Sequence, residues 1–370
     1  MSAELSQGTH RTSPLAAADI DAAARRISSV VTRTPLQYSD RLSALTGAQV
    51  YLKREDLQAV RSYKLRGAYN LLMQLSDEEK AAGVVCSSAG NHAQGFALAC
   101  RSMGVHGRVY VPAKTPKQKR DRIRYHGGDF IELIVGGATY DLAAEAALED
   151  VARTGATLVP PYDDLRTMAG QGTIAVEILE QLDGEPDLVI VPVGGGGCIS
   201  GITTYLTAHT KATAVLGAEP AGAASMIAAL AKGEPVTLEH VDQFVDGAAV
   251  ARAGELTYAA LAAAGDMVSV TTVDEGAVCT AMLDLYQNEG IIAEPAGALT
   301  GRTKQSVLTE YGQEQFLAGH GTQRLQDFQF SGMPADLAAQ GIDNAAAGHG
   351  HERRKGPDNA AVPKYAGQGF

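Results

Sequence analysis

The sequence predicts an α/β protein in which helices cover both faces of parallel β-sheet. Short apolar runs typical of β-strands occur at 48–52, 83–86, 108–112, 130–135, 187–193, 213–218 and 267–272. Amphipathic patterns typical of helices occur at 16–31 and near 63–75, 91–103, 116–126, 139–153, 171–182, 198–208, 225–232 and 274–289. Strands that alternate with helices in this way form βαβ units, whose strands run parallel.

Local signals support individual elements, and the two ends of the chain lack such signals. An alanine-rich amphipathic stretch at 16–31 predicts the first helix, and Thr272 and Glu275 have the spacing of a capping box for the last one. Residues 1–15 are polar, and we expect them to be loosely held. After residue 302 the strand pattern fades, and 340–370 has a composition typical of disorder.

Composition limits the class of protein. The 370 residues include 31 Lys and Arg against 42 Asp and Glu, a net charge of −11, which argues against nucleic acid or an anionic membrane surface as the main partner. No apolar run approaches the roughly 18 residues of a membrane helix, and the N-terminus does not resemble a signal peptide. No CxxC pair occurs among Cys86, Cys100, Cys198 and Cys279. We therefore expect a cytoplasmic protein without disulfides or a metal site.

Lys64 is the first candidate for chemistry. It lies in the first turn of a predicted helix, in the string VRSYKLRGA. The positive end of the helix dipole repels a cation there, and with burial this repulsion would lower the pKa of the amine and make it a better nucleophile and base. The alternative is an ordinary solvated surface lysine, and Lys64 alone does not decide between the two.

The string CSSAGNHAQG, from residue 86, predicts a turn between an apolar strand and a helix. Free backbone N–H groups at the helix start, together with the Ser88 hydroxyl and the Asn91 amide, would bind an anion such as a carboxylate. An ordinary strand-to-helix turn with serine as the N-cap is the alternative. We interpret His92 as a structural histidine rather than a catalyst.

Four consecutive glycines, 194–197, lie between an apolar strand and a helix, in a chain with 41 glycines. A glycine lowers helix or strand stability by roughly 0.5–1 kcal/mol relative to alanine, so a phosphate held by backbone amides at the helix start explains the run better. The run lacks the GK[ST] of a P-loop and departs from GxGxxG. Glu219 nevertheless imitates the ribose-binding acid of a dinucleotide site, so an NAD-dependent oxidoreductase stays open.

The three motifs together point to one kind of cofactor. A phosphate site, an anion-binding turn and a lysine at a helix start suit a phosphorylated carbonyl compound that acts on a carboxylate substrate. Pyridoxal phosphate (pyridoxal 5'-phosphate) is such a cofactor, because a lysine amine forms a Schiff base with it and its ring accepts electrons.

The strings VRSYKLRGA, SSAGNHAQG and VPVGGGG, in this order and spacing, resemble the serine/threonine dehydratase family. The resemblance is closest to its biosynthetic threonine dehydratases (threonine ammonia-lyases) of actinobacterial type and covers about residues 16–300. It implies the tryptophan-synthase β-like fold, fold type II, with two open parallel-sheet domains and the cofactor between them. It also implies a catalytic region over 16–305, in which a smaller subdomain of about 53–160 is inserted, and an atypical tail over 306–370.

The resemblance assigns roles to individual residues. Lys64 is expected to form the Schiff base and to remove the α-proton of the substrate. The cofactor is expected to be held at its 3-oxygen by Asn91 and at its phosphate by Gly194, Gly195, Gly196, Gly197 and Cys198. The substrate carboxylate is expected to lie against Ser88, Ala89, Gly90 and Asn91. Related serine racemases have a second serine where Ala89 stands, so the alanine favours elimination over racemisation.

The implied reaction converts L-threonine to 2-oxobutanoate and ammonia, the first step of isoleucine biosynthesis, with L-serine as a possible further substrate. We expect a homodimer or a homotetramer. The alternatives are a serine dehydratase, a β-replacement synthase of the same fold, or a catalytically impaired pyridoxal-phosphate-binding protein.

The chain departs from the family after about residue 302. The family has an apolar strand ending in SGGN or SGAN about 26 residues beyond Glu294, and its serine faces the pyridine nitrogen of the cofactor. The matching position here is His320, and Ser331 in FQFSGMP is only a weak imitation of that serine. The C-terminal domain that senses isoleucine in longer members is not recognisable. These departures motivate the impaired alternative.

Overall fold

Two parallel sheets carry the fold of residues 14–301, the part of the chain that the computed structural model describes. The expectations for residues 1–13, for the tail from 306 and for Ser331 lie outside these residues. Helices connect the strands within each sheet, as parallel pairing requires. The prediction of an α/β fold with parallel sheets is confirmed.

The first sheet has the strand order β5-β4-β3-β6, and all of its pairs are parallel. Its strands are β3 (Val84–Ser87), β4 (Gly107–Val111), β5 (Ile131–Val135) and β6 (Thr157–Leu158). The helices from the same part of the chain are α3 (Lys64–Leu72), α4 (Asp77–Ala82), α5 (Asn91–Met103), α6 (Lys117–Gly127) and α7 (Tyr140–Thr154).

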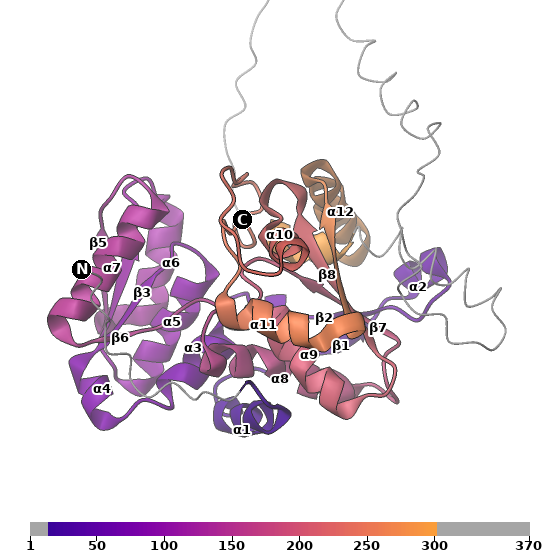
Figure 1. The fold of residues 1–370 in the computed structure, drawn as a ribbon, viewed down its shortest axis with the longest axis horizontal. Helices are drawn as coiled ribbons and strands as arrows, with labels where there is room; N and C mark the ends of the chain where they lie inside the picture. The colour runs from indigo at the N-terminus through magenta and orange to yellow at the C-terminus, as the bar shows by residue number, and fades with distance from the viewer. Residues whose placement is uncertain (1–13, 302–370) are drawn as a thin grey trace, which may run out of the picture. The chain divides into compact units, whose positions relative to one another are not determined.

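Helices cover both faces of this first sheet (Figure 1). Cys86 of β3 packs in a core with residues of α3 and α5, such as Phe96. The neighbouring Val85 packs in a separate cluster with Ala143 and Ala147 of α7. Because successive side chains of a strand point to opposite faces, α5 and α7 must lie on opposite sides of the sheet.

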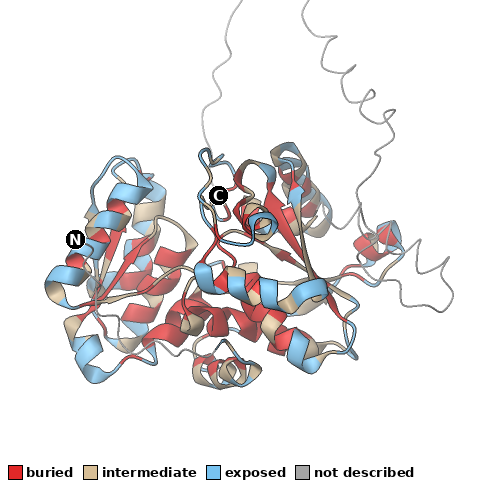
Figure 2. Ribbon diagram, viewed as in Figure 1, coloured by how far each residue is buried: buried red, intermediate tan, exposed pale blue. Residues whose placement is uncertain are grey.

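The second sheet has the order β7-β8-β9, also parallel. Its strands are β7 (Leu188–Pro192), β8 (Ala214–Pro220) and β9 (Val268–Val273). The helices from this part of the chain are α8 (Leu165–Gln181), α9 (Gly197–His209), α10 (Ser225–Lys232), α11 (Glu255–Ala264) and α12 (Glu275–Glu289). All residues of β8 are buried, whereas the helices expose their outer faces (Figure 2).

The remaining elements precede or join these sheets. Two short strands, β1 (Leu36–Tyr38) and β2 (Tyr51–Lys53), pair antiparallel. The helices α1 (Ala17–Ile27) and α2 (Asp40–Thr46) and the 3-10 turns η1 (Glu55–Leu57), η2 (Gly128–Phe130), η3 (Ala221–Ala223) and η4 (Gly265–Met267) complete the fold. Within residues 14–301, every helix is too short or too polar to cross a membrane.

Two sequence expectations need correction. The helix predicted at 171–182 begins at Leu165, because the Asp164 side chain accepts hydrogen bonds from the backbone N–H of Arg166 (2.7 Å) and Thr167 (3.4 Å). The capping box of Thr272 and Glu275 is wrong, because Thr272 still belongs to β9. The N-cap of α12 is Asp274, whose carboxylate accepts from the N–H of Gly276 at 2.8 Å.

Candidate active site

The three motifs singled out in the sequence line one cleft of about 2490 Å³. Lys64 lies there at the start of α3, Ser88 to Asn91 lie between β3 and α5, and Gly194 to Cys198 lie between β7 and α9. All predicted site residues are therefore brought together, although about 130 residues separate the first motif from the last. The cleft is also lined by Pro161, Tyr162 and Glu294, which lie on loops and were not predicted as site residues.

Lys64 is the first residue of α3, with Tyr63 as its N-cap. Its Nζ donates a hydrogen bond to the carbonyl oxygen of Pro161 at 3.0 Å. Desolvation lowers the pKa of the Lys64 amine, and the nearby carboxylate of Glu294 opposes only part of that shift. An amine in this position carries a proton less firmly than a surface lysine, so it is suited to act as a nucleophile and a base.

A buried ion network fixes the helix that carries Lys64. The Arg66 side chain is fully buried and donates to Glu55 (2.8 and 2.9 Å) and to Glu177 (2.7 and 3.0 Å). Lys53 also donates to Glu177, at 2.6 Å. Burial alone would raise the pKa of Glu177, but the hydrogen bonds from Arg66 and Lys53 hold it below its ordinary value. The network ties α3 to η1, β2 and α8.

The turn before α5 differs from the alternative in which a serine is the N-cap of the helix. The N-cap of α5 is Gly90, without a side-chain hydrogen bond, and the Ser88 hydroxyl accepts from the N–H of Gly90 at 3.3 Å. The Asn91 side chain points its amide at a carboxylate, because Nδ2 lies 2.7 Å from both Oε1 and Oε2 of Glu294. Burial raises the pKa of Glu294, and Asn91 partly offsets this. Glu294, in the repeated string EPAGA, was missed as a site residue.

His92 is held as a neutral imidazole next to the cleft. Its Nε2 lies 2.8 Å from the carbonyl oxygen of Val159, which identifies Nε2 as the protonated nitrogen. Burial, together with the charge of Lys64, lowers the pKa of His92 to about 3. Its Nδ1 has no hydrogen-bond partner among the described residues. This geometry supports the interpretation of His92 as a structural residue.

The glycine run is required by packing as well as by any ligand. Gly196 has φ +93°, which side chains rarely adopt. A Cβ on Gly195 would lie 2.4 Å from the Tyr162 ring, and one on Gly197 would lie 2.9 Å from the Tyr162 backbone. The Gly195 carbonyl is fixed by the Thr257 hydroxyl at 2.7 Å. The sequence displays the glycine run, but it did not predict that the Tyr162 ring packs against it.

The start of α9 presents donors for an anion. The first N–H groups of a helix have no intrahelical partner, and within residues 14–301 no side chain caps this helix, so the N–H groups of Gly197 and Cys198 can bind a ligand. Burial raises the pKa of the Cys198 thiol to about 12, so the thiol stays protonated and adds no negative charge. A phosphate is the anion that such a site suits best.

Glu219 does not serve a dinucleotide in this structure. Its buried carboxylate accepts from the N–H of Met226 (2.7 Å) and of Ile227 (3.0 Å) at the start of α10. Burial raises the pKa of Glu219 to about 7, and these backbone hydrogen bonds work against that shift. Because its oxygens cap a helix, the NAD alternative loses the acidic residue on which it depended.

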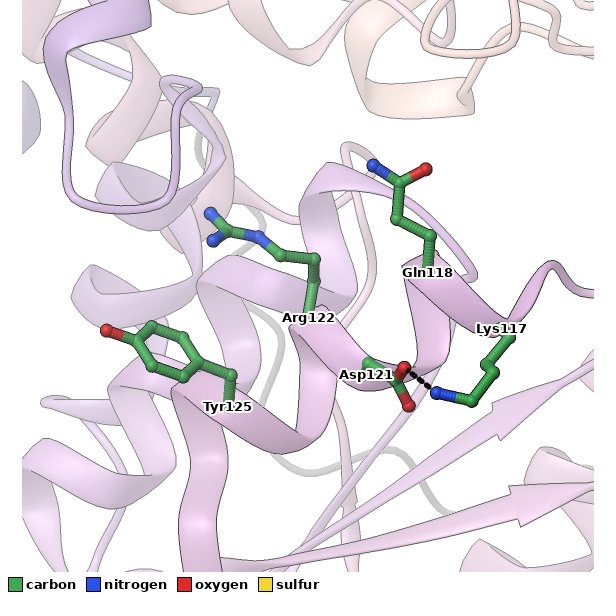
Figure 3. Close-up of a pocket in the computed structure, with 5 residues that line it drawn as sticks. All are labelled: Lys117, Gln118, Asp121, Arg122 and Tyr125. Atoms are coloured by element: carbon green, nitrogen blue, oxygen red, sulfur yellow. Dashed lines mark hydrogen bonds and ion pairs between the residues drawn. The ribbon is translucent and has the colours of Figure 1, made fainter. Parts of the chain in front are cut away.

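A second hollow, of about 500 Å³, lies on α6 and lacks comparable chemistry (Figure 3). Lys117, Gln118, Asp121, Arg122 and Tyr125 line it, and the Lys117 ammonium pairs with the Asp121 carboxylate on the same helix. Its side chains are largely exposed, with 70% of Tyr125 accessible. The large cleft is therefore the better candidate for the active site.

A family model described as pyridoxal-phosphate dependent enzyme matches residues 27–302. The chain belongs to this family. The match spans all three motifs, so the resemblance seen in the sequence and the expected cofactor, pyridoxal phosphate, are confirmed. The family also accounts for the lysine, the turn and the glycine run at once, which the NAD alternative does not.

Curated relatives in the family are highly similar. Over 303 residues the chain is 83% identical to "L-threonine dehydratase biosynthetic IlvA" of Mycobacterium tuberculosis (strain ATCC 25618 / H37Rv), covering 81% of this chain and 70% of the relative. The protein of the same name from Corynebacterium glutamicum is 60% identical over 287 residues, covering 77% of this chain and 66% of the relative.

Solved structures in the family share the fold. The processed form of threonine deaminase isoform 2 from Solanum lycopersicum superimposes with a TM-score of 0.74 at 38% identity, over 80% of this chain and 79% of that one. Maize serine racemase superimposes with a TM-score of 0.74 at 32% identity, over 80% of this chain and 90% of that one. The expectation of fold type II is confirmed.

Proposed function

We propose that this chain is a threonine ammonia-lyase, which uses pyridoxal phosphate to convert L-threonine into 2-oxobutanoate and ammonia. The relatives at 83% and 60% identity are named for threonine dehydration. The observation that carries the proposal is that a desolvated lysine amine, an asparagine amide and a glycine-rich helix start line one cleft. The reaction fits the first step of isoleucine biosynthesis.

The residues of the cleft fit pyridoxal phosphate. Its aldehyde needs an amine that is not firmly protonated. Burial lowers the pKa of two amines that line the cleft, but the Lys53 amine is paired with the Glu177 carboxylate at 2.6 Å, which leaves Lys64 as the amine suited to this role. Its phosphate needs backbone donors, which Gly194 to Gly197 and Cys198 offer at the start of α9. Its 3-oxygen needs a donor, and Asn91 directs its amide into the cleft. When bound, the cofactor would withdraw electrons from the α-carbon of the amino acid and make the α-proton acidic.

The residues of this chain then have separate tasks. Lys64 removes the α-proton, because its lowered pKa leaves a larger fraction of the amine unprotonated. The turn from Ser88 to Asn91 binds the substrate carboxylate through the N–H groups at the start of α5. Ala89 has no hydroxyl that could return a proton on the opposite face. Racemisation is therefore disfavoured relative to elimination, in which the β-hydroxyl takes up a proton and leaves as water.

The decisive experiment tests the cofactor and the reaction together. The full chain is purified with pyridoxal phosphate, its visible absorbance is recorded, and borohydride labelling is mapped by mass spectrometry. The release of 2-oxo acid is assayed with L-threonine and with L-serine. We expect a yellow protein, a label on Lys64 and a faster release of 2-oxo acid from L-threonine.

The matched variants are Lys64→Ala and Lys211→Ala, the second at an exposed lysine on a loop. We expect the first to lose both label and product formation and the second to keep both. A colourless wild-type protein without a label would contradict the cofactor assignment. A yellow protein without 2-oxo acid would favour the β-replacement synthase or the impaired alternative, and a preference for L-serine would favour the serine dehydratase.

The assembly and the location of the protein belong to the same proposal. A homodimer or homotetramer, which light scattering would measure, stays a prediction, as does the cytoplasmic location. The division into a catalytic region over 16–305, with its inserted subdomain, and a tail over 306–370 is also a proposal.

A further inference from the structure

Six consecutive residues, 159–164, join β6 to α8 and contact both halves of the proposed cofactor site. At their first end, the N–H of Val159 donates to Val85 of β3 at 2.8 Å, and the Val159 carbonyl accepts from His92 at 2.8 Å. Two residues later, the Pro161 carbonyl accepts from the Lys64 amine at 3.0 Å. Because proline fixes its φ angle, Pro161 and its neighbour Pro160 make the connection between these two carbonyls stiff.

The next residue reaches the glycine run. The Tyr162 ring and backbone lie against the Cα atoms of Gly195 and Gly197, where a Cβ would come within 2.4 and 2.9 Å of them. The Tyr162 hydroxyl donates to the Arg252 carbonyl at 3.2 Å, which limits rotation of the ring. Tyr162 therefore closes one side of the glycine run, while the run also lines the cleft.

The last two residues anchor the segment to two helices. Asp163 caps α11 by accepting from the N–H of Glu255 (3.0 Å) and of Leu256 (2.9 Å). Asp164 caps α8 by accepting from the N–H of Arg166 at 2.7 Å. The segment is thus fixed at both ends and cannot shift at Pro161 or Tyr162 without breaking hydrogen bonds.

We propose that residues 159–164 form a brace that sets the distance between the Lys64 amine and the glycine run, with His92 and Tyr162 as its positioning residues. The proposal rests on the proposed function. Pyridoxal phosphate joins its aldehyde carbon to its phosphate through a rigid ring and a short methylene linker, so the amine and the phosphate donors must lie within the narrow range of separations that this linker can span. A small error in such a separation weakens binding and slows reaction.

The first test addresses the glycine end of the brace. Tyr162→Ala removes the ring, whereas Tyr162→Phe keeps it and loses only the hydroxyl. We expect the alanine variant to raise the dissociation constant of pyridoxal phosphate at least about tenfold and to shift its ³¹P resonance, and the phenylalanine variant to stay within about twofold of wild type. Pyridoxal lacks the phosphate, so its capture, which is the formation of a borohydride-trapped Schiff base with Lys64, should change little in either variant.

The second test addresses the lysine end. His92→Phe removes the donor to Val159, whereas His92→Gln places an amide N–H at a similar reach. We expect His92→Phe to slow the borohydride-trapped labelling of Lys64 by pyridoxal about fivefold or more, and His92→Gln to restore most of the rate. Ile123→Ala is the control for general stability, because it shortens a fully buried side chain in the core that contains Cys86 and Phe96. It should destabilise the fold and leave the rate of Lys64 labelling in the folded protein unchanged.

The outcomes separate the brace from the cofactor site itself. If Tyr162→Ala and His92→Phe bind and capture both compounds as wild type does, the brace is overturned and the proposed function stands. If Ile123→Ala reduces capture as strongly as they do, the effect is one of general stability, and the brace is again overturned. A wild-type protein that captures no pyridoxal phosphate at Lys64 overturns the proposed function and the brace together.

Discussion

The Asn91 amide nitrogen lies 2.7 Å from each carboxylate oxygen of Glu294, 203 residues away in the sequence. The same carboxylate favours the protonated form of the Lys64 amine. Glu294 therefore acts on two of the residues to which we assign cofactor binding. Its carboxylate accepts from the Asn91 amide, which we expect to bind the 3-oxygen of the cofactor, and it raises the pKa of the Lys64 amine.

The first prediction concerns the charge of Glu294. Because the carboxylate raises the pKa of Lys64, Glu294→Gln should lower that pKa further and leave more free amine at a given pH. The pH at which capture of pyridoxal phosphate is half-maximal should therefore move down. The midpoint is measured from visible absorbance, with Glu132→Gln on the exposed side of β5 as the control. An unchanged or higher midpoint in Glu294→Gln would contradict the assignment.

The second prediction concerns the network behind Lys64. Arg66→Leu leaves the carboxylates of Glu55 and Glu177 without their buried partner, and breaking such a pair destabilises by about 3–5 kcal/mol. The folded pKa of Glu177 is lowered, so its pairing contributes stability above the ordinary carboxylate pKa and loses it as the pH falls through the folded pKa.

Urea unfolding at several pH values measures this effect. The difference in unfolding free energy between wild type and Arg66→Leu should be largest near pH 7 and should shrink as the carboxylates become protonated in acid. Arg33→Leu, which breaks the exposed pair with Glu180, should change stability by less than about 1 kcal/mol. A difference that is constant with pH would rule out a charge-based role for Arg66.

The sequence was informative at the three site motifs, where the structure is set locally. The strand before Ser88, the helix from Asn91 and the glycine run before α9 all follow from apolar runs that end in small residues. Lys64 was placed correctly because its helix begins within the motif itself. Such features depend on residues a few positions apart, which one sequence displays.

The contacts that complete the site were beyond local patterns. Pro161 meets Lys64 across 97 residues, and nothing in the string VPPYDD marks that carbonyl as a partner. The strand β6 was missed because only Thr157 and Leu158 pair, too few for a strand pattern. The start of α8 could have been found, since an aspartate before a helical pattern is an N-cap signal, but Asp164 was not recognised as one.

The third prediction concerns the crossing of α8 and α9. A Cβ on Gly201 would lie 2.3 Å from the Met168 carbonyl oxygen and 2.7 Å from the Gly172 nitrogen, both backbone atoms that cannot rotate away. Gly201→Ala should therefore separate the two helices and destabilise the protein by roughly 1–3 kcal/mol. Gly136→Ala, where no atom lies within 4 Å, is the control and should change stability little. Thermal unfolding of both variants measures this, and equal midpoints would contradict the close crossing.

The fourth prediction concerns the buried carboxylate that caps α10. Burial raises the pKa of Glu219 from 4.5 to about 7, so between these values the folded chain binds a proton that the unfolded chain has released. The contribution of this group to stability is then fully present at acid pH and falls as the pH rises from about 4.5 to 7, by roughly 3 kcal/mol in total.

Glu219→Gln removes this titration while keeping one oxygen for the N–H of Met226 or Ile227. The unfolding free energy of wild type minus that of the variant should therefore decrease steadily between pH 5 and pH 7.5. A flat difference for Glu219→Gln would mean that this carboxyl titrates at its ordinary pKa and that burial does not hold its proton.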